Sequence, residues 1–326
     1  MEVTKIHNIN FLENTLPDKC ANLIIADPPY FEVKGDFDFV WKSFDDYLID
    51  VQKWAIECKR LLADNGTLFW YGHAKNIAYS QVILDEHFEL INNLVWEKTN
   101  CQTKKSIEYF RMFAPITERI LMYSNDNDLS FIMNDQTLFK SIRDYFLEEK
   151  AKCNLSFKQI NETCFNSASN GGGMASNILT ADKDGWSFPT QEKYEALQKI
   201  GICQKPYIDL KMEYDYLKAE YESLRRPFQN SKKLTDVLRF SQQANITGNY
   251  DHETCKPEHL TRTLILTCSR EDDLVVVPFA GSGTECAMAV KEGRKSIGFE
   301  ITEKHAKMSN DRVQNILRQP SLFVGS

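Results

Sequence analysis

Short apolar segments alternate with amphipathic segments near both ends of this chain of 326 residues, and no other feature limits its fold as strongly. The apolar segments predict strands, and apolar residues that recur every three or four positions predict helices. Strands that alternate with helices are typical of an α/β fold, a mainly parallel sheet with helices on both faces. Asn65-Gly66 is expected to end the first helix. The predicted strands cover residues 23–26, 67–71, 90–96, 119–123, 274–277 and 296–299, and the predicted helices cover 44–62, 76–88, 257–268, 284–292 and 303–317.

The alternation stops between residues 124 and 252, where the periodicity is weak. One long helix is predicted there, over residues 208–226, and Pro227 would stop it. Its apolar residues recur at spacings of four and three, a stripe that more often packs on its own domain than on a partner. We therefore expect one α/β domain, divided into residues 1–123 and 253–326, with residues 124–252 as an insertion.

Composition excludes several classes of protein. No apolar run approaches the length that spans a membrane, and the first residues lack the apolar core of a signal peptide. The nine cysteines include no C-x-x-C pair, so reduced thiols in a cytoplasmic protein are the simplest interpretation. No metal site is expected, since the segment His252–Cys255 has no second ligand pair at a suitable spacing. A formal net charge of −7 argues against indiscriminate coating of nucleic acid but allows a local basic cleft.

The residues Asp27-Pro28-Pro29-Tyr30 directly follow the first predicted strand and form the first chemical motif. Proline has no backbone N–H and a fixed φ, so two successive prolines make this loop stiff and keep it out of both helix and sheet. The loop presents a carboxylate, unpaired carbonyl oxygens and a flat ring. These groups suit the binding of a planar molecule that carries an exocyclic amine.

The second motif is a glycine turn between a strand rich in valine and a helix, over residues 275–284. Such a turn brings backbone N–H groups close to a ligand. Glu300 ends the next strand, where an acid can bind the two hydroxyls of a ribose. Cys286 occupies the place of the third glycine of a dinucleotide fingerprint, and no phosphate-binding P-loop occurs. The pattern favours a nucleoside cofactor without a pyrophosphate, although a purely structural turn is an alternative.

Together the two motifs resemble the S-adenosylmethionine-dependent DNA amino-methyltransferases, which modify adenine N6 or cytosine N4. The Asp-Pro-Pro-Tyr motif precedes the Phe-x-Gly-x-Gly motif, Phe279–Gly283, with a long segment between them. This order resembles that of the beta class, and the resemblance covers nearly the whole chain outside the middle segment. It implies a Rossmann-like methyltransferase sheet, in which the inserted region recognises the target sequence.

The resemblance implies a catalytic role for the motif Asp27, Pro28, Pro29 and Tyr30. Asp27 and the backbone carbonyl of Pro28 would accept hydrogen bonds from the target amine. Tyr30 would stack on a base that has flipped out of the duplex. The amine nitrogen would then attack the sulfonium methyl directly, so catalysis would rest on positioning and charge placement.

The resemblance also implies a site for S-adenosyl-L-methionine. Glu300 would hold its ribose, and Lys256-Pro257 stands where the family often has a Gln-Lys-Pro step beside the methionine part. This sequence departs from the family pattern at four positions, which bear on cofactor affinity more than on reaction type. Asn8 occupies the position of an Asp near the adenine, Val277 that of an Asp, Cys255 that of a Gln and His305 that of a Tyr. The implied cofactor residues are Asn8, Asp27, Lys256, Pro257, Phe279, Ala280, Gly281, Ser282, Gly283, Thr284 and Glu300.

Two groups of basic residues are candidate contacts to DNA phosphates. The first follows a predicted strand close to the active-site face, but a solvated charged loop is about equally expected. The second follows the long helix, and there contact with the DNA backbone is slightly favoured. Trp96 could wall the base pocket, although a core tryptophan is the favoured interpretation. The candidates are Lys98, Lys104, Lys105 and Arg111 in the first group, and Arg225 and Arg226 in the second.

The sequence therefore predicts an adenine-N6 DNA methyltransferase, of the kind found in restriction–modification, that acts on double-stranded DNA. Cytosine N4 is the alternative within the class, because Ser is more frequent there at the first motif position and Asp favours adenine. A catalytically silent DNA-binding subunit is a second alternative, although such subunits tend to lose the acid or the Tyr. A homodimer is left open, and no membrane partner is expected.

Overall fold

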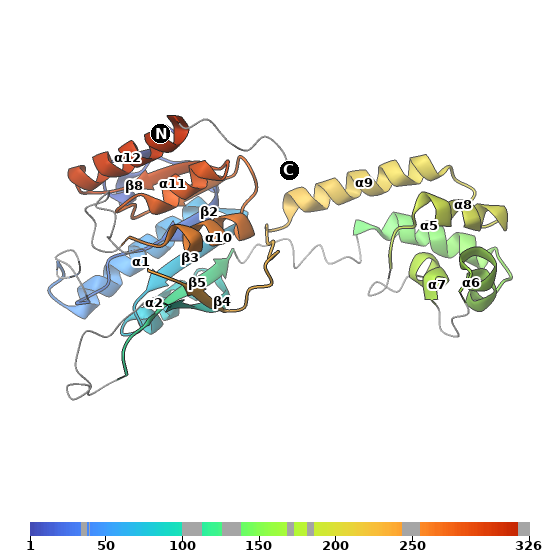
Figure 1. Ribbon diagram of the computed structural model, residues 1–326, viewed down its shortest axis with the longest axis horizontal. Coiled ribbons are helices and arrows are strands. Elements are labelled where there is room, and N and C mark those ends of the chain that lie inside the picture. The colour runs from blue at the N-terminus through green and yellow to red at the C-terminus, as the bar shows by residue number, and fades with distance from the viewer. Residues whose placement is uncertain are drawn as a thin grey trace. The chain divides into compact units, whose positions relative to one another are not determined.

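The computed structural model describes residues 1–33, 38, 40–99, 113–125, 138–167, 173–180, 186–242 and 255–318. The chain divides into two compact units, Met1–Asp128 with Arg226–Ser326, and Leu129–Arg225. The first unit contains the sheet, and the second, green to yellow in Figure 1, is built from helices. Among the described residues, no helix is both long enough and apolar enough to span a membrane.

The first unit is built on a mixed sheet in the order β1-β8-β7-β2-β3-β5-β4-β6 (Figure 1). Only β5, of the strands described, runs antiparallel to its neighbours, and the remaining pairs are parallel. The predicted mostly parallel sheet is thus confirmed. The strands are β1 Lys5–His7, β2 Ala21–Ala26, β3 Leu62–Gly72, β4 Glu89–Lys98, β5 Thr117–Ser124, β6 Val237–Phe240, β7 Leu274–Val277 and β8 Lys295–Phe299.

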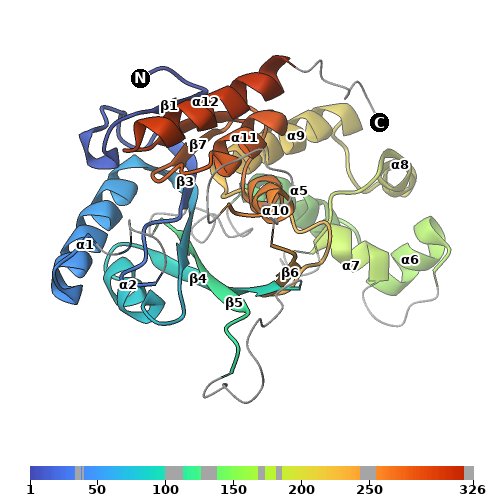
Figure 2. The ribbon, with the colours of Figure 1, turned by 60° about the vertical axis from the view of Figure 1, so that its left-hand side comes forward.

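Helices cover both faces of this sheet, as the alternation predicted (Figure 2). Successive residues of a strand point to opposite faces. Ile24 of β2 accordingly packs in the core with Val51, whereas Ile25 packs with Leu264 on the other side. One face carries α1 Phe44–Leu61 and α2 Ile77–Leu84, and the other carries α10 Glu258–Cys268, α11 Thr284–Lys291 and α12 Glu303–Arg318.

The predicted end of α1, Leu62, is correct to within one residue, but the predicted stop signal, Asn65-Gly66, was wrong. The helix ends at Leu61, and Leu62 is already extended, with φ −69° and ψ 127°. Leu62 is completely buried and pairs with Ala21 of β2, so tertiary packing draws the chain into the sheet before the Asn65-Gly66 step. That step lies inside β3, where the β2–β3 register is irregular. The short strands β1 and β6 were not predicted, because neither forms a continuous apolar run: Lys5–His7 has one apolar residue, and Arg239 interrupts Val237–Phe240.

The second unit has its own apolar core, which includes Phe146, Ile160, Ile178 and Leu197. The predicted long helix is α9 Tyr207–Leu224, and Leu210 and its partly buried stripe neighbours pack against this core. The stripe therefore belongs to its own unit. The sequence did not predict the other helices, α5 Lys140–Ala151, α6 Phe157–Phe165, α7 Gly173–Leu179 and α8 Gln191–Lys199.

The helical unit is shorter than the expected insertion. The chain rejoins the first unit at Arg226, well before residue 252. β6 then pairs with β4, and its Leu238 is buried in the core of the first unit. The segment after α9 is thus part of the sheet domain.

Candidate active site

The residues of both sequence motifs lie at one edge of the sheet. The strands β1, β8, β7 and β2 are adjacent and parallel, so they all end at this edge. The residues that follow them there are Asn8, Glu300, Pro278 and Asp27. Because β5 is antiparallel, it begins at the same edge, with Glu118 paired to Trp96 of β4. Ligands of open α/β sheets bind outside such carboxyl ends.

The Asp-Pro-Pro-Tyr loop is held by contacts inside and outside the motif. The hydroxyl of Tyr30 donates to Asp27 Oδ1 at 2.5 Å. The backbone N–H of Tyr30 donates to Oδ1 of Asp38, also at 2.5 Å, and the Asn76 amide donates to the Phe31 carbonyl at 2.8 Å. Burial, together with the charges of Asp27 and Glu118, raises the pKa of Tyr30 well above its usual value. The tyrosine is therefore a neutral hydrogen-bond donor.

Four side chains at this edge form a row of alternating charge, Lys98–Glu118–Lys256–Asp27, which we call the charge row. Lys256 Nζ lies 3.0 Å from Asp27 Oδ1 and 3.1 Å from Glu118 Oε2. Lys98 Nζ lies 2.5 Å from the other oxygen of Glu118. The Lys256 side chain is 6% exposed, those of Lys98 and Glu118 are 13% exposed, and that of Asp27 is 22% exposed. Water therefore screens these charges only weakly.

The charge row keeps both of its central members ionised. Burial alone would raise the pKa of Glu118, but the ammonium groups of Lys256 and Lys98 outweigh it and lower the pKa to about 2. Burial alone would lower the pKa of Lys256, but the carboxylates of Asp27 and Glu118 outweigh it and raise the pKa. Lys256 also lies over the ring of Tyr71, 4.9 Å from the ring centroid.

The glycine turn after β7 is fixed by hydrogen bonds to its backbone. Gly281 and Gly283 have φ angles of 47° and 71°, a region that disfavours residues with a Cβ. The N–H of Gly281 donates to Glu300 Oε2 at 2.9 Å, and the N–H of Thr302 donates to Oε1 at 2.9 Å. Ser309 of α12 donates to the Gly281 carbonyl at 2.7 Å. The Glu300 carboxylate is thereby oriented at the turn.

Arg312 of α12 joins the turn to α10, where Lys256-Pro257 precedes the helix. Its guanidinium donates to Thr284 Oγ1 at 2.9 Å and to Glu258 Oε1 at 2.7 Å. The side chain is 3% exposed, so these contacts are shielded from water. Two segments that are distant in sequence are thus held at one place.

Two of the predicted cofactor residues lie beside this turn. The Asn8 amide donates to the backbone carbonyls of Glu300 and Ile301, at 2.8 and 3.0 Å. The Phe279 ring packs edge-on against Trp54, with 4.9 Å between the ring centroids. Phe279 therefore also belongs to the core on the α1 face.

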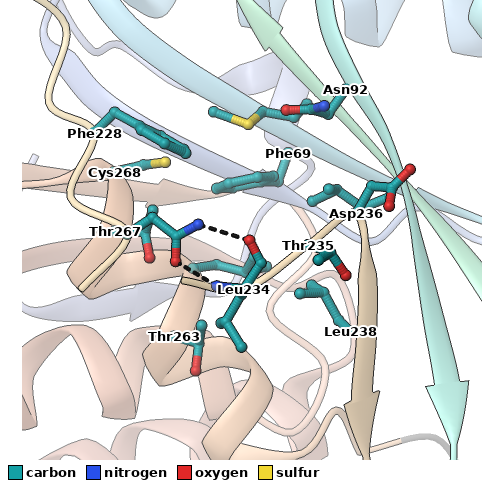
Figure 3. A pocket seen from close by; sticks show the side chains of 14 residues that line it. Phe69, Asn92, Phe228, Leu234, Thr235, Asp236, Leu238, Thr263, Thr267 and Cys268 are labelled. Atoms are coloured by element: carbon teal, nitrogen blue, oxygen red, sulfur yellow. Dashed lines mark hydrogen bonds between the residues drawn. The ribbon is translucent and has the colours of Figure 1, made fainter. Parts of the chain in front are cut away.

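A cavity of about 150 Å³ lies elsewhere in the first unit, between α10 and the sheet (Figure 3). The residues that line it are mostly apolar and include Phe69, Leu238 and Cys268. The Asn230 amide exchanges two hydrogen bonds with the backbone of Leu234, drawn dashed in Figure 3, and so closes the loop beside it. Asp27, the charge row and Glu300 do not line this cavity, which is separate from the candidate active site.

The predicted DNA-contacting residues have other partners or lie outside the described residues. Lys98 pairs with Glu118, and Arg225 pairs with Glu222 at 2.6 Å. The Arg226 guanidinium lies 5.7 Å from the ring centroid of Phe228. Trp96 is buried in the core and donates to the Phe240 carbonyl, as the favoured interpretation expected. The residues outside the described part of the chain are Lys104, Lys105 and Arg111, and also His252 of the weak metal pattern.

Sequence reasoning missed three acidic residues of this edge. Glu118 is the second residue of β5, and only the antiparallel direction of this strand brings it to the edge. Asp38 follows the motif without a recognisable spacing. Glu285 is buried at the start of α11, where the charge of Asp27 acts on it. Glu285 directly follows the glycine motif, and that position was the only available signal.

The chain matches a family model, N6/N4 methyltransferase, described as DNA methylase, over residues 21–311. It is 24% identical to the DNA adenine methyltransferase YhdJ of Escherichia coli K12 over 304 residues, 91% of this chain and 78% of that protein. Its fold is similar to that of a Thermus thermophilus protein described as a DNA modification methylase, in complex with S-adenosyl-L-methionine. That match has a TM-score of 0.51 and 16% identity, over 96% of this chain and 94% of the other. The cytosine-N4-specific PvuII DNA methyltransferase matches with a TM-score of 0.52 and 13% identity, over 96% and 92% of the two chains.

Proposed function

This chain belongs to the N6/N4 family of DNA methylases, and we propose that it transfers a methyl group from S-adenosyl-L-methionine to adenine N6 in double-stranded DNA. One observation carries the proposal. The Asp27–Tyr30 loop follows β2, the glycine turn follows the adjacent strand β7, and Glu300 follows β8 at the same sheet edge. An acceptor for an amine and a site for a nucleoside are therefore neighbours. The similarity to an adenine methyltransferase over most of both chains supports adenine as the target.

The groups at the glycine turn fit a nucleoside cofactor. A carboxylate oxygen has two lone pairs, so Glu300 can accept ribose hydroxyls in addition to the backbone N–H groups that orient it. Two further proposed cofactor residues, Asn8 and Gly281, are hydrogen-bonded to Glu300. When bound, the sulfonium cofactor supplies an activated methyl group. Lys256-Pro257, held through Glu258 and Arg312, is proposed to line the methionine part.

Asp27 and Pro28 are proposed to act on the target amine through hydrogen bonds. Asp27 accepts a hydrogen bond from one N–H of the amine and the Pro28 carbonyl accepts one from the other N–H, which draws the nitrogen towards tetrahedral geometry and frees its lone pair from conjugation with the ring. Tyr30 stacks on the base, which must leave the duplex because its amine is otherwise paired. The nitrogen forms its bond to the methyl carbon as the bond from that carbon to sulfur breaks. The methylated nitrogen then passes a proton to the Asp27 carboxylate or to water, which restores a neutral amine.

The helical unit, Leu129–Arg225, is proposed to recognise the DNA sequence. Its core is separate from the cores around the sheet, so its surface can vary without disturbing the catalytic edge. The homodimer and the cytoplasmic location expected from the sequence stay predictions.

Replacement of Asp27 tests the proposal. Asp27→Ala should reduce transfer of tritium-labelled methyl groups to DNA by about 100-fold or more, because the amine loses its charged acceptor. DNA binding, measured by fluorescence anisotropy, should change little. Asp85→Ala is the matched control, since Asp85 also accepts a tyrosine hydroxyl, that of Tyr123, at 2.7 Å.

The outcomes separate the alternatives. Full activity of the Asp27→Ala variant would reject the mechanism. Cofactor binding without any transfer by the unmodified protein, on DNA of varied sequence, would instead favour a catalytically silent DNA-binding subunit.

A further inference from the structure

We propose that Glu118 is a positioning residue for methyl transfer, which holds the ammonium group of Lys256 against Asp27. The inference rests on the proposed function, because Asp27 is the acceptor of the target amine there. Neither Glu118 nor its contact with Lys256 belongs to the two motifs that identify the chain. The charge row supplies the evidence.

The contacts show how Glu118 acts through Lys256. Each oxygen of the Glu118 carboxylate has one ammonium partner, Oε1 with Lys98 at 2.5 Å and Oε2 with Lys256 at 3.1 Å. A carboxylate fixed at both oxygens cannot rotate freely. Lys256, in turn, has a carboxylate on either side, Glu118 and Asp27. The position of its ammonium group is therefore set by Glu118 as much as by Asp27.

Lys256 and Tyr30 both act on the same oxygen of Asp27. The Tyr30 hydroxyl donates to Oδ1 at 2.5 Å, and Lys256 Nζ lies 3.0 Å from it. Lys256 also donates to the Tyr30 hydroxyl at 3.3 Å, so the three groups form a closed triangle. Two donors on one oxygen fix the plane of the carboxylate, which decides where its other oxygen points. That direction sets how well Asp27 can accept a hydrogen bond from the target amine.

The charge row is neutral in total, and this matters beside a cationic methyl donor. The charges of the two ammonium groups and the two carboxylates cancel. Without the charge of Glu118, Lys98 and Lys256 would be balanced by Asp27 alone, and one net positive charge would remain. An uncompensated buried cation would repel the sulfonium, and burial weakens screening by water. Glu118 thus has two functions, to hold Lys256 in place and to balance its charge.

The test replaces Glu118 by Gln, which keeps the shape and removes the charge. Glu118→Gln should lower kcat about 10- to 100-fold, because small misplacement of a positioned group is costly. KM for DNA should change less than about threefold, since DNA does not contact Glu118 in this proposal. Affinity for S-adenosyl-L-methionine should fall more than affinity for uncharged S-adenosylhomocysteine, because only the former carries the sulfonium charge. Equal losses for both ligands would contradict the charge-balancing function.

Two variants separate positioning from stability. The double variant Lys98→Met with Glu118→Gln removes a buried pair together, so its melting temperature should recover towards that of the unmodified protein. Its kcat should stay low, because Lys256 still lacks its second carboxylate. Recovery of kcat together with the melting temperature would show that Lys256 needs no second carboxylate to stay in position, and it would overturn the inference. Glu292→Gln is the matched control, because Glu292 pairs with Arg262 at 2.6 Å and its side chain is 14% exposed.

The pH profile gives a readout that a structural role would not change. Among the described residues, the groups that face or act on Lys256 are Asp27, Tyr30, Tyr71, Glu118 and Glu285, and Lys98 and His73 act through Glu118. Burial lowers the pKa of Lys256, and the carboxylates of Asp27 and Glu118 raise it. Without the Glu118 carboxylate the pKa should be lower, so Lys256 should lose its proton at lower pH. The kcat of Glu118→Gln should therefore fall at alkaline pH where that of the unmodified protein is still level. Identical profiles would overturn the inference.

A measurement without methyl transfer keeps the two proposals distinguishable. The 13Cε NMR signal of Lys256, assigned with Lys256→Met in protein labelled with 13C-lysine, reports whether the ammonium is ionised. It should titrate at lower pH in Glu118→Gln than in the unmodified protein, even if no DNA is methylated. An inactive protein with this shift would reject the proposed function alone. An active protein without the shift would reject only the role of Glu118.

Discussion

At the scale of single residues, Asp27 and Glu285 show how one sheet edge places two acids in opposite environments. Asp27 has two donors on one oxygen, Tyr30 and Lys256. Glu285 is 4% exposed, and within the described part of the chain its Oε1 atom has no hydrogen-bond partner. Burial, and after it the charge of Asp27, raises the pKa of Glu285 to about 7. A backbone hydrogen bond and the charges of Lys256 and Arg312 offset this effect only in part, so the buried carboxyl favours its neutral form.

Glu285 should therefore make the protein less stable as the pH rises. Its pKa in the folded protein, about 7, exceeds its usual value of 4.5, so between these values the folded state binds the proton more tightly than the unfolded state does. The contribution of Glu285 to the free energy of unfolding falls by at most about 3 kcal/mol as the pH rises across this window. Above the window this contribution no longer changes with pH. Glu285→Gln should remove the effect and be more stable than the unmodified protein at pH 8.

Urea unfolding at pH 5 and pH 8 checks this prediction. The stability difference between variant and unmodified protein should be larger at pH 8, because only there is Glu285 ionised in the fold. A difference that is the same at both pH values would show that Glu285 is not a buried acid with a raised pKa. Glu292→Gln again serves as a control with a paired acid.

At the scale of elements, the start of α11 depends on the absence of a side chain at Gly283. Its φ angle is 71°, and an added Cβ would lie 2.7 Å from Ser309 Cβ and 3.1 Å from Ser309 Cα. Because one of these atoms is helix backbone of α12, a rotamer change cannot relieve the clash. Gly283→Ala should lower the free energy of unfolding by about 2–5 kcal/mol, the sum of left-handed strain and overpacking.

Gly293, just after α11, provides the control for this prediction. Its φ angle is 77°, but an added Cβ would meet only Glu271 Cγ, at 3.9 Å. Gly293→Ala should thus suffer the backbone strain alone, about 1–2 kcal/mol. Urea unfolding of both variants measures the difference. Equal losses would mean that α11 and α12 do not pack as tightly at the glycine turn as described.

The elements also show what the sequence can and cannot predict. Both motifs were recognisable because each is a continuous segment at a strand end, Asp27–Tyr30 and the turn around Gly281. Glu118 was not, because its place depends on the direction of β5 and on its pairing with β4. The Asn65-Gly66 step was wrongly assigned as the signal that ends α1, because burial of Leu62 in the sheet ends the helix before that step. Local chemistry is visible in sequence, whereas partners across the sheet are not.

At the scale of the whole molecule, two units with separate cores imply two separable tasks. The cores around the sheet contain residues of the first unit, and the core of the helical unit contains residues from Leu138 to Tyr221. Replacement of residues 129–225 by a flexible linker should therefore leave cofactor binding within about threefold of the original affinity, while sequence-specific methylation is lost.

Calorimetric titration with S-adenosyl-L-methionine and a methylation assay on mixed DNA sequences measure the two tasks. Retained site specificity in the shortened protein would place DNA recognition in the first unit. Loss of cofactor binding would show that the sheet domain needs the helical unit.

The identity of the methylated nucleoside shows which reaction takes place at Asp27. The unmodified protein is incubated with double-stranded DNA and S-adenosyl-L-methionine, the DNA is digested to nucleosides, and the products are identified by mass spectrometry against standards. We predict N6-methyladenine as the product, and its absence from the Asp27→Ala sample. N4-methylcytosine as the product would contradict the choice of base, and no methylated nucleoside at all would contradict the claim that this sheet edge is a methyltransferase active site.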